Sequence, residues 1–105
     1  MADLSGIVES GERAEVLADV LKGIGHPARL RIVAALCRSS RNVGELAGLL
    51  GFRQAMVSQH LSLLRLHGLV ASKKNGTRIT YFLKEKRLKK LIECLAGCKQ
   101  HPAAA

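Results

Sequence analysis

Apolar residues recur at helical spacing in five stretches of the chain: residues 12–24, 27 to about 37, 43–50, 54–66, and about 84 to 96. In the first stretch they occupy positions i, i+1, i+4, i+5 and i+8, which is one face of an amphipathic helix. That face consists of Val16, Leu17, Val20, Leu21 and Ile24. The last stretch carries a similar stripe of Leu88, Leu91, Ile92 and Leu95. The pattern predicts five helices.

Residues that begin or end helices stand between these stretches. Gly25 ends the first helix, and Pro27 opens the second at a first-turn position, where the missing N–H costs nothing. Asn42 can cap the third helix and Gly51 ends it. Gly68 closes the fourth helix as a left-handed C-cap residue. A turn of only three or four residues therefore joins the third helix to the fourth.

Between the fourth and fifth helices the period of the pattern changes to two. Residues 69–74 and 77–83 are rich in β-forming side chains. Asn75-Gly76 between them is a strong hairpin signal, because both residues tolerate positive φ. The predicted fold is mostly α with one β-hairpin, in the order α-α-α-α-β-β-α. Two short helices joined by a Gly-containing turn and followed by a basic hairpin make a winged helix-turn-helix.

The length of 105 residues and a hydrophobic content of 48% predict one globular domain. Aromatic residues are only 3%, so the core must be built from aliphatic side chains, as in packed helices. We expect a flexible segment over residues 1–11, the winged domain over residues 12–98, and a frayed tail over residues 99–105. The chain has no apolar run of membrane-spanning length and no signal-peptide pattern, so we expect a cytoplasmic protein without a membrane partner.

The charge of the chain narrows the class of partner. Seventeen Lys and Arg against 8 Asp and Glu give a formal charge of +9 and a pI near 10.1. A small domain this basic usually binds a polyanion, such as DNA, RNA or an anionic membrane surface. No acid–base pair, Gly-rich phosphate loop or activated nucleophile stands out, so we do not expect an enzyme.

The fourth helix carries side chains suited to reading DNA. If Val57, Leu61 and Leu64 face the core, a row of short polar residues without carboxylates faces solvent. Gln can pair bidentately with adenine, Ser can donate or accept at any base edge, and Ala can contact a thymine methyl group. We assign base reading to Gln54, Ser58, Gln59 and Ser62, with Ala55 beside them.

Basic residues flank this helix face and surround the hairpin turn. We assign them to phosphate contacts, which set position and affinity rather than sequence preference. They are Arg53, Arg65, Lys73, Lys74 and Arg78. His60 joins them as a phosphate contact, with packing beside the turn as its equal alternative. The Lys-rich opening of the last helix is expected to be a solvated face.

Four segments resemble the ArsR–SmtB family of bacterial repressors: GHPARLRI at 25–32, VGELA at 43–47, VSQHLSLLRLHGLV at 57–70 and GTRITYFL at 76–83. The resemblance covers about residues 12–98. It implies a homodimer formed through the first and last helices, an imperfect palindromic operator, and release of that operator when an effector binds. It also implies that Gln54, Ser58, Gln59 and Ser62 enter the major groove. The apolar stripes of the two outer helices support a dimer independently, because one small domain has little interior to cover both.

Three cysteines are candidate sensors of the effector: Cys37, Cys94 and Cys98. Their odd number and a reducing cytoplasm argue against structural disulfides. Cys94 and Cys98 are four residues apart on the last helix and can bind a soft ion such as arsenite or cadmium, with Cys37 as third ligand. Lys89, Lys90 and Lys99 are expected to lower the pKa of a nearby thiol.

The sequence alone leaves the identity of the cofactor and of the effector open. The metalloid site known in the family needs a Cys-x-Cys pair where this chain has Val43-Gly44-Glu45, and the zinc-type site needs Asp and His ligands that the last helix lacks. Cys37 with Cys98 resembles instead the branch of the family that senses reactive sulfur. Cys37 can equally be a small buried core residue.

The sequence therefore predicts a sequence-specific repressor whose thiols respond to an effector, either reactive sulfur or an oxidant, or a soft metal or metalloid. The alternative is an effector-independent or non-specific basic nucleic-acid-binding protein. Such a protein would gain nothing from the acid-free polar face of the fourth helix.

Overall fold

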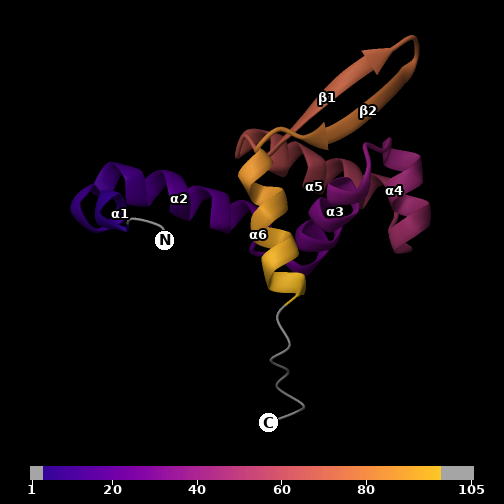
Figure 1. Cartoon of the computed structure of the whole chain (residues 1–105). Helices are drawn as coiled ribbons and strands as arrows, with labels where there is room; N and C mark the ends of the chain where they lie inside the picture. The colour runs from indigo at the N-terminus through magenta and orange to yellow at the C-terminus, as the bar shows by residue number, and fades with distance from the viewer. Residues whose placement is uncertain (1–3, 98–105) are drawn as a thin grey trace.

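The computed structural model describes residues 4–97 of the chain, and Figure 1 shows their arrangement. The elements are α1 (Ser5–Glu9), α2 (Gly11–Ile24), α3 (Pro27–Arg38), α4 (Val43–Leu50), α5 (Gln54–Leu66), β1 (Val70–Asn75), β2 (Arg78–Leu83) and α6 (Lys86–Ala96). The five predicted helices and the hairpin are all present, so the predicted winged helix-turn-helix is confirmed. The short helix α1 is an additional element, and it lies in the segment that was expected to be flexible.

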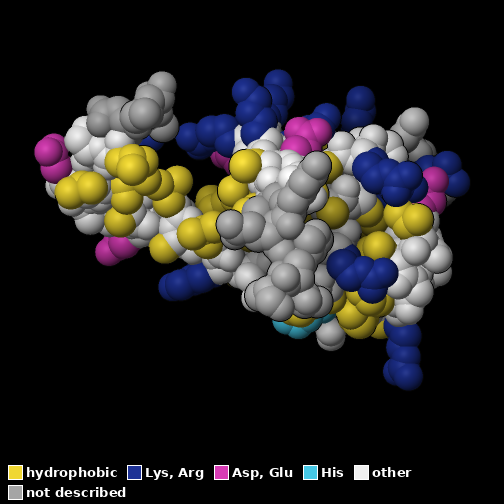
Figure 2. Space-filling model, turned by 60° about the horizontal axis from the view of Figure 1, so that its bottom comes forward, with side chains coloured by type: hydrophobic (Ala, Val, Ile, Leu, Met, Phe, Trp, Pro, Cys, Tyr) yellow, Lys and Arg dark blue, Asp and Glu magenta, His cyan; other side chains and the backbone are white. Residues whose placement is uncertain are grey.

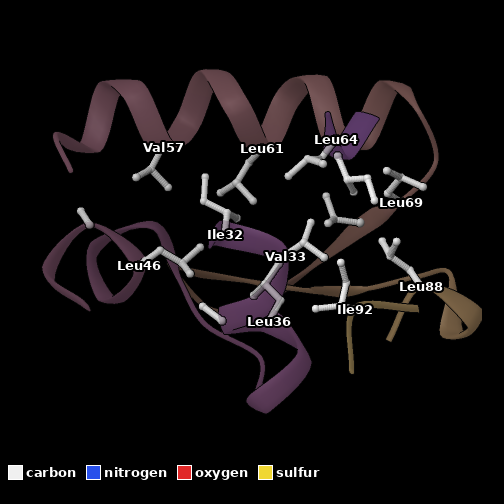
Figure 3. Close-up of a cluster of buried hydrophobic side chains, with 14 residues drawn as sticks. Ile32, Val33, Leu36, Leu46, Val57, Leu61, Leu64, Leu69, Leu88 and Ile92 are labelled. Carbon is white, nitrogen blue, oxygen red and sulfur yellow. The ribbon is translucent and has the colours of Figure 1, made fainter. Parts of the chain in front are cut away.

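The core lies where α3, α4, α5, β1 and α6 meet (Figure 3). Its fully buried side chains are aliphatic, as the scarcity of aromatic residues requires. They are Ile32, Val33, Leu46, Val57, Leu61, Leu64, Leu69 and Leu88. Burying a Leu, Ile or Val side chain stabilises a fold by about 1.5–3 kcal/mol relative to leaving it exposed. The predicted inward orientation of Val57, Leu61 and Leu64 is confirmed, whereas Leu95 of the predicted stripe on the last helix is 58% exposed.

Helix α4 begins with a capping box. The Asn42 side chain accepts a hydrogen bond from the Glu45 N–H at 2.7 Å, and the Glu45 carboxylate accepts one from the Asn42 N–H at 2.9 Å. The helix ends at Gly51, whose φ of 73° is a left-handed conformation that glycine adopts without strain. Residues 51–53 connect α4 to α5, which begins at Gln54. This connection fixes the direction of α5 against the core.

Strands β1 and β2 form an antiparallel hairpin, paired from Val70 with Leu83 to Asn75 with Arg78. The two-residue loop is therefore Gly76-Thr77, one residue later than the predicted Asn75-Gly76. Asn75 stays in the strand because the loop needs positive φ only at its first residue, and Gly76 supplies it with 67°. We call this hairpin the wing.

An isolated β-bridge attaches the wing to the connection between α3 and α4. The Arg41 N–H donates to the Tyr81 carbonyl at 3.1 Å, and the Tyr81 N–H donates to the Arg41 carbonyl at 2.8 Å. These two bonds hold the base of the wing beside the start of α4. The wing and the helix-turn-helix are thus joined by backbone contacts as well as by the chain itself.

Helices α1 and α2 extend away from the rest of the molecule, and we call them the arm (Figure 1). Only Gly23 and Ile24, at the end of α2, are buried. The apolar stripe predicted for this helix is therefore mostly open to solvent. None of the helices in the described part of the chain is both long and apolar enough to span a membrane.

Candidate nucleic-acid interface

The orientation of α5 separates its side chains into two sets. Val57, Leu61 and Leu64 are fully buried and point toward the helix α3 (Figure 3). The opposite side carries exposed short residues that we call the polar face: Gln54, Ala55, Ser58, Gln59 and Ser62. The structure thus brings all four residues assigned to base reading onto one exposed surface. Their contact with DNA bases stays a prediction.

Two details of α5 were not foreseen from the sequence. The Ser62 hydroxyl donates a hydrogen bond to the Ser58 carbonyl at 3.0 Å, which leaves its lone pairs free to accept from a base amino group. Leu66, on the last turn of the same side, is 80% exposed. The polar face therefore occupies the first three turns of α5 and ends before Leu66.

The surface around the polar face is free of acidic residues over a long segment. No Asp or Glu stands between Glu45 and Glu85, while this segment contains six Lys and Arg. The five residues assigned to phosphate contacts are all exposed: Arg53, Arg65, Lys73, Lys74 and Arg78. Arg53 and Arg65 lie at the two ends of α5, and the other three lie on the wing on either side of its loop. The excess of Lys and Arg in this segment gives it the positive charge that favours a polyanion.

His60 lies on the flank of α5 rather than on the polar face. Its ring is half-buried, with its centroid 4.8 Å from that of His26, the residue that caps α3. Burial, followed by the neighbouring charges of His26 and Arg29, lowers the pKa of His60 below its ordinary value of 6.5. Its Nδ1 atom is buried and has no hydrogen-bond partner among the described residues. These contacts describe the packing alternative, and the phosphate role of His60 stays a prediction.

Cys37 lies in a groove between α3, β2 and α6. Its side chain is half-buried, and the groove also contains Lys89 and Glu93. Burial and the nearby Glu93 carboxylate raise the pKa of the Cys37 thiol, and Lys89 only partly opposes them. Lys89 lowers the pKa of this thiol, as expected of a nearby lysine, but its effect is smaller than the two that raise the pKa. Desolvation and a carboxylate one turn after Lys89 outweigh the lysine.

Of the other two candidate thiols, only Cys94 lies within the described residues, and it does not line the groove that contains Cys37. Cys94 is exposed on α6 and is reduced, as is Cys37. Cys98 lies outside the described residues. Within residues 4–97 no group of three or more His, Cys, Asp or Glu side chains is arranged to hold a metal ion. The three-cysteine metal site therefore stays a prediction that depends on Cys98.

The arm and α6 enclose an apolar groove. It is lined by Ile7 of α1, by Leu17 and Leu21 of α2, and by Leu88 and Leu91 of α6. Figure 2 shows the arm at the left, with a cluster of hydrophobic side chains flanked by acidic ones. The apolar stripes of the first and last predicted helices thus face one shared groove, open to solvent in the single chain.

Two polar contacts near α5 were missed entirely. His67 Nδ1 lies 3.0 Å from Asp19 Oδ1, although the two residues are 48 positions apart in the sequence. Arg29 Nε donates to the Gly23 carbonyl at 2.7 Å, which ties the end of α2 to α3. No local pattern signals either contact, because each depends on how two helices pack.

Comparison with known proteins gives a uniform result. The family model described as "Bacterial regulatory protein, arsR family" matches residues 26–72, which run from the N-cap of α3 into β1. The biofilm growth-associated repressor of Agrobacterium fabrum is 39% identical over 84 residues, covering 80% of this chain and 72% of that protein. The transcriptional activator HlyU of Vibrio cholerae is 34% identical over 93 residues, covering 89% and 83%.

Solved structures agree with the sequence relatives. The repressor BigR of Xylella fastidiosa superimposes with a TM-score of 0.77 at 36% identity, covering 85% of this chain and 93% of that one. HlyU of Vibrio cholerae also gives 0.77, at 32% identity, covering 82% and 94%. The Agrobacterium and Xylella proteins are named as repressors and HlyU as an activator, so the direction of regulation varies among these relatives.

Proposed function

Since the chain belongs to the arsR family of bacterial regulatory proteins, we propose that this DNA-binding transcriptional regulator acts as a homodimeric repressor of a palindromic operator. In this proposal the polar face of α5 reads bases in the major groove, and the wing contacts the flanking phosphates. An effector that reacts with or binds cysteine thiols releases the DNA. The protein works by binding rather than by catalysis and, because its partner is chromosomal DNA, it works in the cytoplasm.

One observation carries the DNA-reading part of this proposal. The polar face is exposed on a helix whose opposite side, formed by Val57, Leu61 and Leu64, is fully buried, so its orientation is fixed without any contribution from the polar residues themselves. Short Gln and Ser side chains add little to solubility or helix stability there. They are, however, the groups that match the donor and acceptor pattern of base edges.

The proposed dimer is supported by the apolar groove between the arm and α6. Val16 and Leu21 are 59% and 56% exposed in the single chain. A two-fold partner would cover the groove and place two α5 helices on successive turns of the duplex, about 34–36 Å apart.

Selection from a random duplex pool tests the DNA-reading proposal. We expect the wild-type protein to enrich one palindromic sequence and to bind it at least about 10³-fold more tightly than random duplex. Enrichment of no sequence, with tight binding to every duplex, would instead establish the alternative of a non-specific basic nucleic-acid-binding protein. The net charge of +9 is the observation that favours that alternative.

The groove around Cys37 bears on the class of effector. Lys86, Lys89 and Lys90 line it against the single carboxylate of Glu93. This charge balance favours an anionic sulfur species or oxidant over a metal cation, because like charges repel at short distance. Cys37 lines this groove, but its raised pKa lowers its thiolate fraction, so Cys37, the exposed Cys94 and Cys98 all stay candidates for the first point of reaction.

Mass spectrometry of the intact protein separates the effector classes. The protein is exposed separately to polysulfide, arsenite, cadmium and zinc. We expect polysulfide to add sulfur or remove thiol hydrogens, and to release the selected operator. A bound metal or metalloid without sulfur addition would replace the sulfur proposal by the metal alternative.

Cysteine variants test whether these thiols sense at all. Cys37→Ser, and separately Cys94→Ser with Cys98→Ser, should leave operator affinity unchanged, because none of these residues lies on the polar face or the wing. At least one of the two variants should lose the release of DNA by the effector. Normal release by both variants would contradict thiol sensing.

A further inference from the structure

The contact between Asp19 and His67 joins the two functional parts of the molecule. Asp19 lies on α2 in the arm, and His67 is the residue that ends α5. His67 Nδ1 and Asp19 Oδ1 are 3.0 Å apart, with the His67 side chain 22% exposed and that of Asp19 55% exposed. In the described structure this is the side-chain hydrogen bond that links the arm to the helix carrying the polar face.

Close packing lies beside this bond. A Cβ atom placed on Gly23 would come within 2.5 Å of Leu69 Cδ1 and 3.3 Å of the His67 side chain. Leu69 is itself buried in the core. Any larger residue at position 23 would therefore require the buried Leu69 side chain to shift. The end of α2 is fixed by packing, and Asp19, one turn earlier, fixes the direction in which the helix leaves the domain.

We propose that Asp19 and His67 are positioning residues that set the angle of the arm relative to α5, and thereby the half-site spacing that the dimer accepts. This inference rests on the proposed dimer. If the arm forms the two-fold interface, its angle to α5 determines how far apart the two polar faces lie. The Asp19–His67 contact lies between the proposed dimer interface and the polar face. It therefore controls the half-site spacing without contacting the partner subunit or the DNA.

A change in half-site spacing moves and rotates the second half-site by a defined amount. Inserting one base pair between the half-sites moves the second half-site by about 3.4 Å along the axis and turns it by roughly 35°. A rigid arm cannot follow this change, so the wild-type protein binds one spacing. An arm that has lost the Asp19 bond pivots about Gly23 and follows it.

The test uses the half-site that the wild-type protein selects from random duplex. Duplexes are built with the selected spacing, with one base pair more, and with one base pair fewer. We expect wild type to prefer the selected spacing by about tenfold or more, since a misplaced base contact is worth that much. In Asp19→Ala the preference should fall to about twofold, while affinity for a duplex with a single half-site is unchanged.

Two further variants separate positioning from charge and from folding. Asp19→Asn keeps a hydrogen bond to either tautomer of His67 and should restore most of the spacing preference. Glu15 and Asp19 line one groove beside His67. Glu15→Ala removes a carboxylate from that groove but leaves the Asp19–His67 contact in place, so it should behave as wild type. If Asp19→Ala does not fold by circular dichroism, His67→Leu is measured in its place, because Leu keeps a side chain there but cannot hydrogen-bond to Asp19.

The outcomes are distinct. Loss of spacing preference in Asp19→Ala, with rescue by Asp19→Asn, supports the positioning role. An unchanged preference, an equal loss at all spacings, or an equal effect of Glu15→Ala overturns it. A wild-type protein that has no spacing preference contradicts the proposed dimer on a palindrome itself, and does so before any variant is measured.

Discussion

The arm and the polar face of α5 are two exposed helical surfaces with opposite chemistry. The arm exposes large apolar side chains, with Val8 80% and Val16 59% accessible, and between Glu9 and Asp19 it carries four carboxylates. The polar face exposes small hydrogen-bonding side chains within a segment that has no carboxylate from residue 46 to residue 84. The arm thus combines large apolar side chains with carboxylates, whereas the polar face combines small hydrogen-bonding side chains with the absence of carboxylates.

This difference supports the proposal that one small domain serves two kinds of partner. An exposed apolar stripe is stabilised by covering it with another apolar surface, so the arm suits a second copy of the protein. An acid-free polar surface among lysines and arginines suits a polyanion whose base edges offer donors and acceptors. The arm contacts the C-terminal end of the helix that carries the polar face, where Asp19 lies 3.0 Å from His67.

The largest expected effect comes from placing charge on the arm. Val16→Asp with Leu21→Asp would bury four unpaired carboxylates in the proposed dimer, at several kcal/mol each. We expect dimer dissociation to increase by at least about 10³-fold, as measured by sedimentation equilibrium. Leu49→Asp on the exposed side of α4 is the matched control and should leave the dimer intact. If the double variant remains dimeric, the arm is not part of the dimer interface.

Truncating one side chain behind the polar face and one on the arm compares how much each region contributes to the free energy of unfolding. Leu61→Ala removes a fully buried side chain behind the polar face and should lower the free energy of unfolding by about 2–5 kcal/mol. Leu21→Ala on the arm should change it by less than about 0.5 kcal/mol at a concentration where the protein is monomeric. Urea denaturation compares them. Equal losses would mean that the arm belongs to the core.

Salt dependence isolates the contribution of the wing. Lys73→Gln with Lys74→Gln should reduce the slope of log affinity against log salt by about 0.9 for each phosphate contact removed. Preference among sequences should hardly change, since phosphate contacts carry no base information. Lys86→Gln with Lys90→Gln on α6 is the control with the same change of charge. An equal reduction in that control would place α6 on the DNA as well.

The smallest effect concerns the pH dependence of the packing behind α5. Because the pKa of His60 is lowered in the folded protein, the unfolded chain binds more protons once the pH falls below about 6.5. Stability should therefore fall as the pH is lowered from 7 to 5. His60→Gln should show a smaller fall in the urea midpoint over this range. An identical pH profile in the variant would mean that His60 does not contribute.

Much of the fold could be predicted from the sequence because its signals are local. The bounds of α5 follow from Gly51 before it, Gly68 after it and the spacing of Val57, Leu61 and Leu64 between them. The cap of α4 follows likewise from Asn42 and Glu45. The loop of the wing was misplaced by one residue, because Asn75-Gly76 and Gly76-Thr77 both contain the required glycine, and only strand pairing decides between them.

The features that could not be predicted depend on packing between distant elements. The raised pKa of Cys37 could not be predicted, since its burial against α6 and the position of Glu93 appear only in three dimensions. The Asp19–His67 contact joins residues with no shared pattern. The candidate base-reading residues, in contrast, could be chosen from helical periodicity alone, because their exposure follows from which residues of the same helix are apolar.

The most direct test of the central claim is the ratio of random-duplex Kd to selected-operator Kd, measured for Ser58→Ala, Gln59→Ala and Ser62→Ala combined. Each lost base contact is worth about 1–3 kcal/mol. We therefore predict that the ratio falls at least about 100-fold from the wild-type value, while binding to random duplex stays the same. A ratio equal to that of wild type would show that the polar face of α5 does not read DNA.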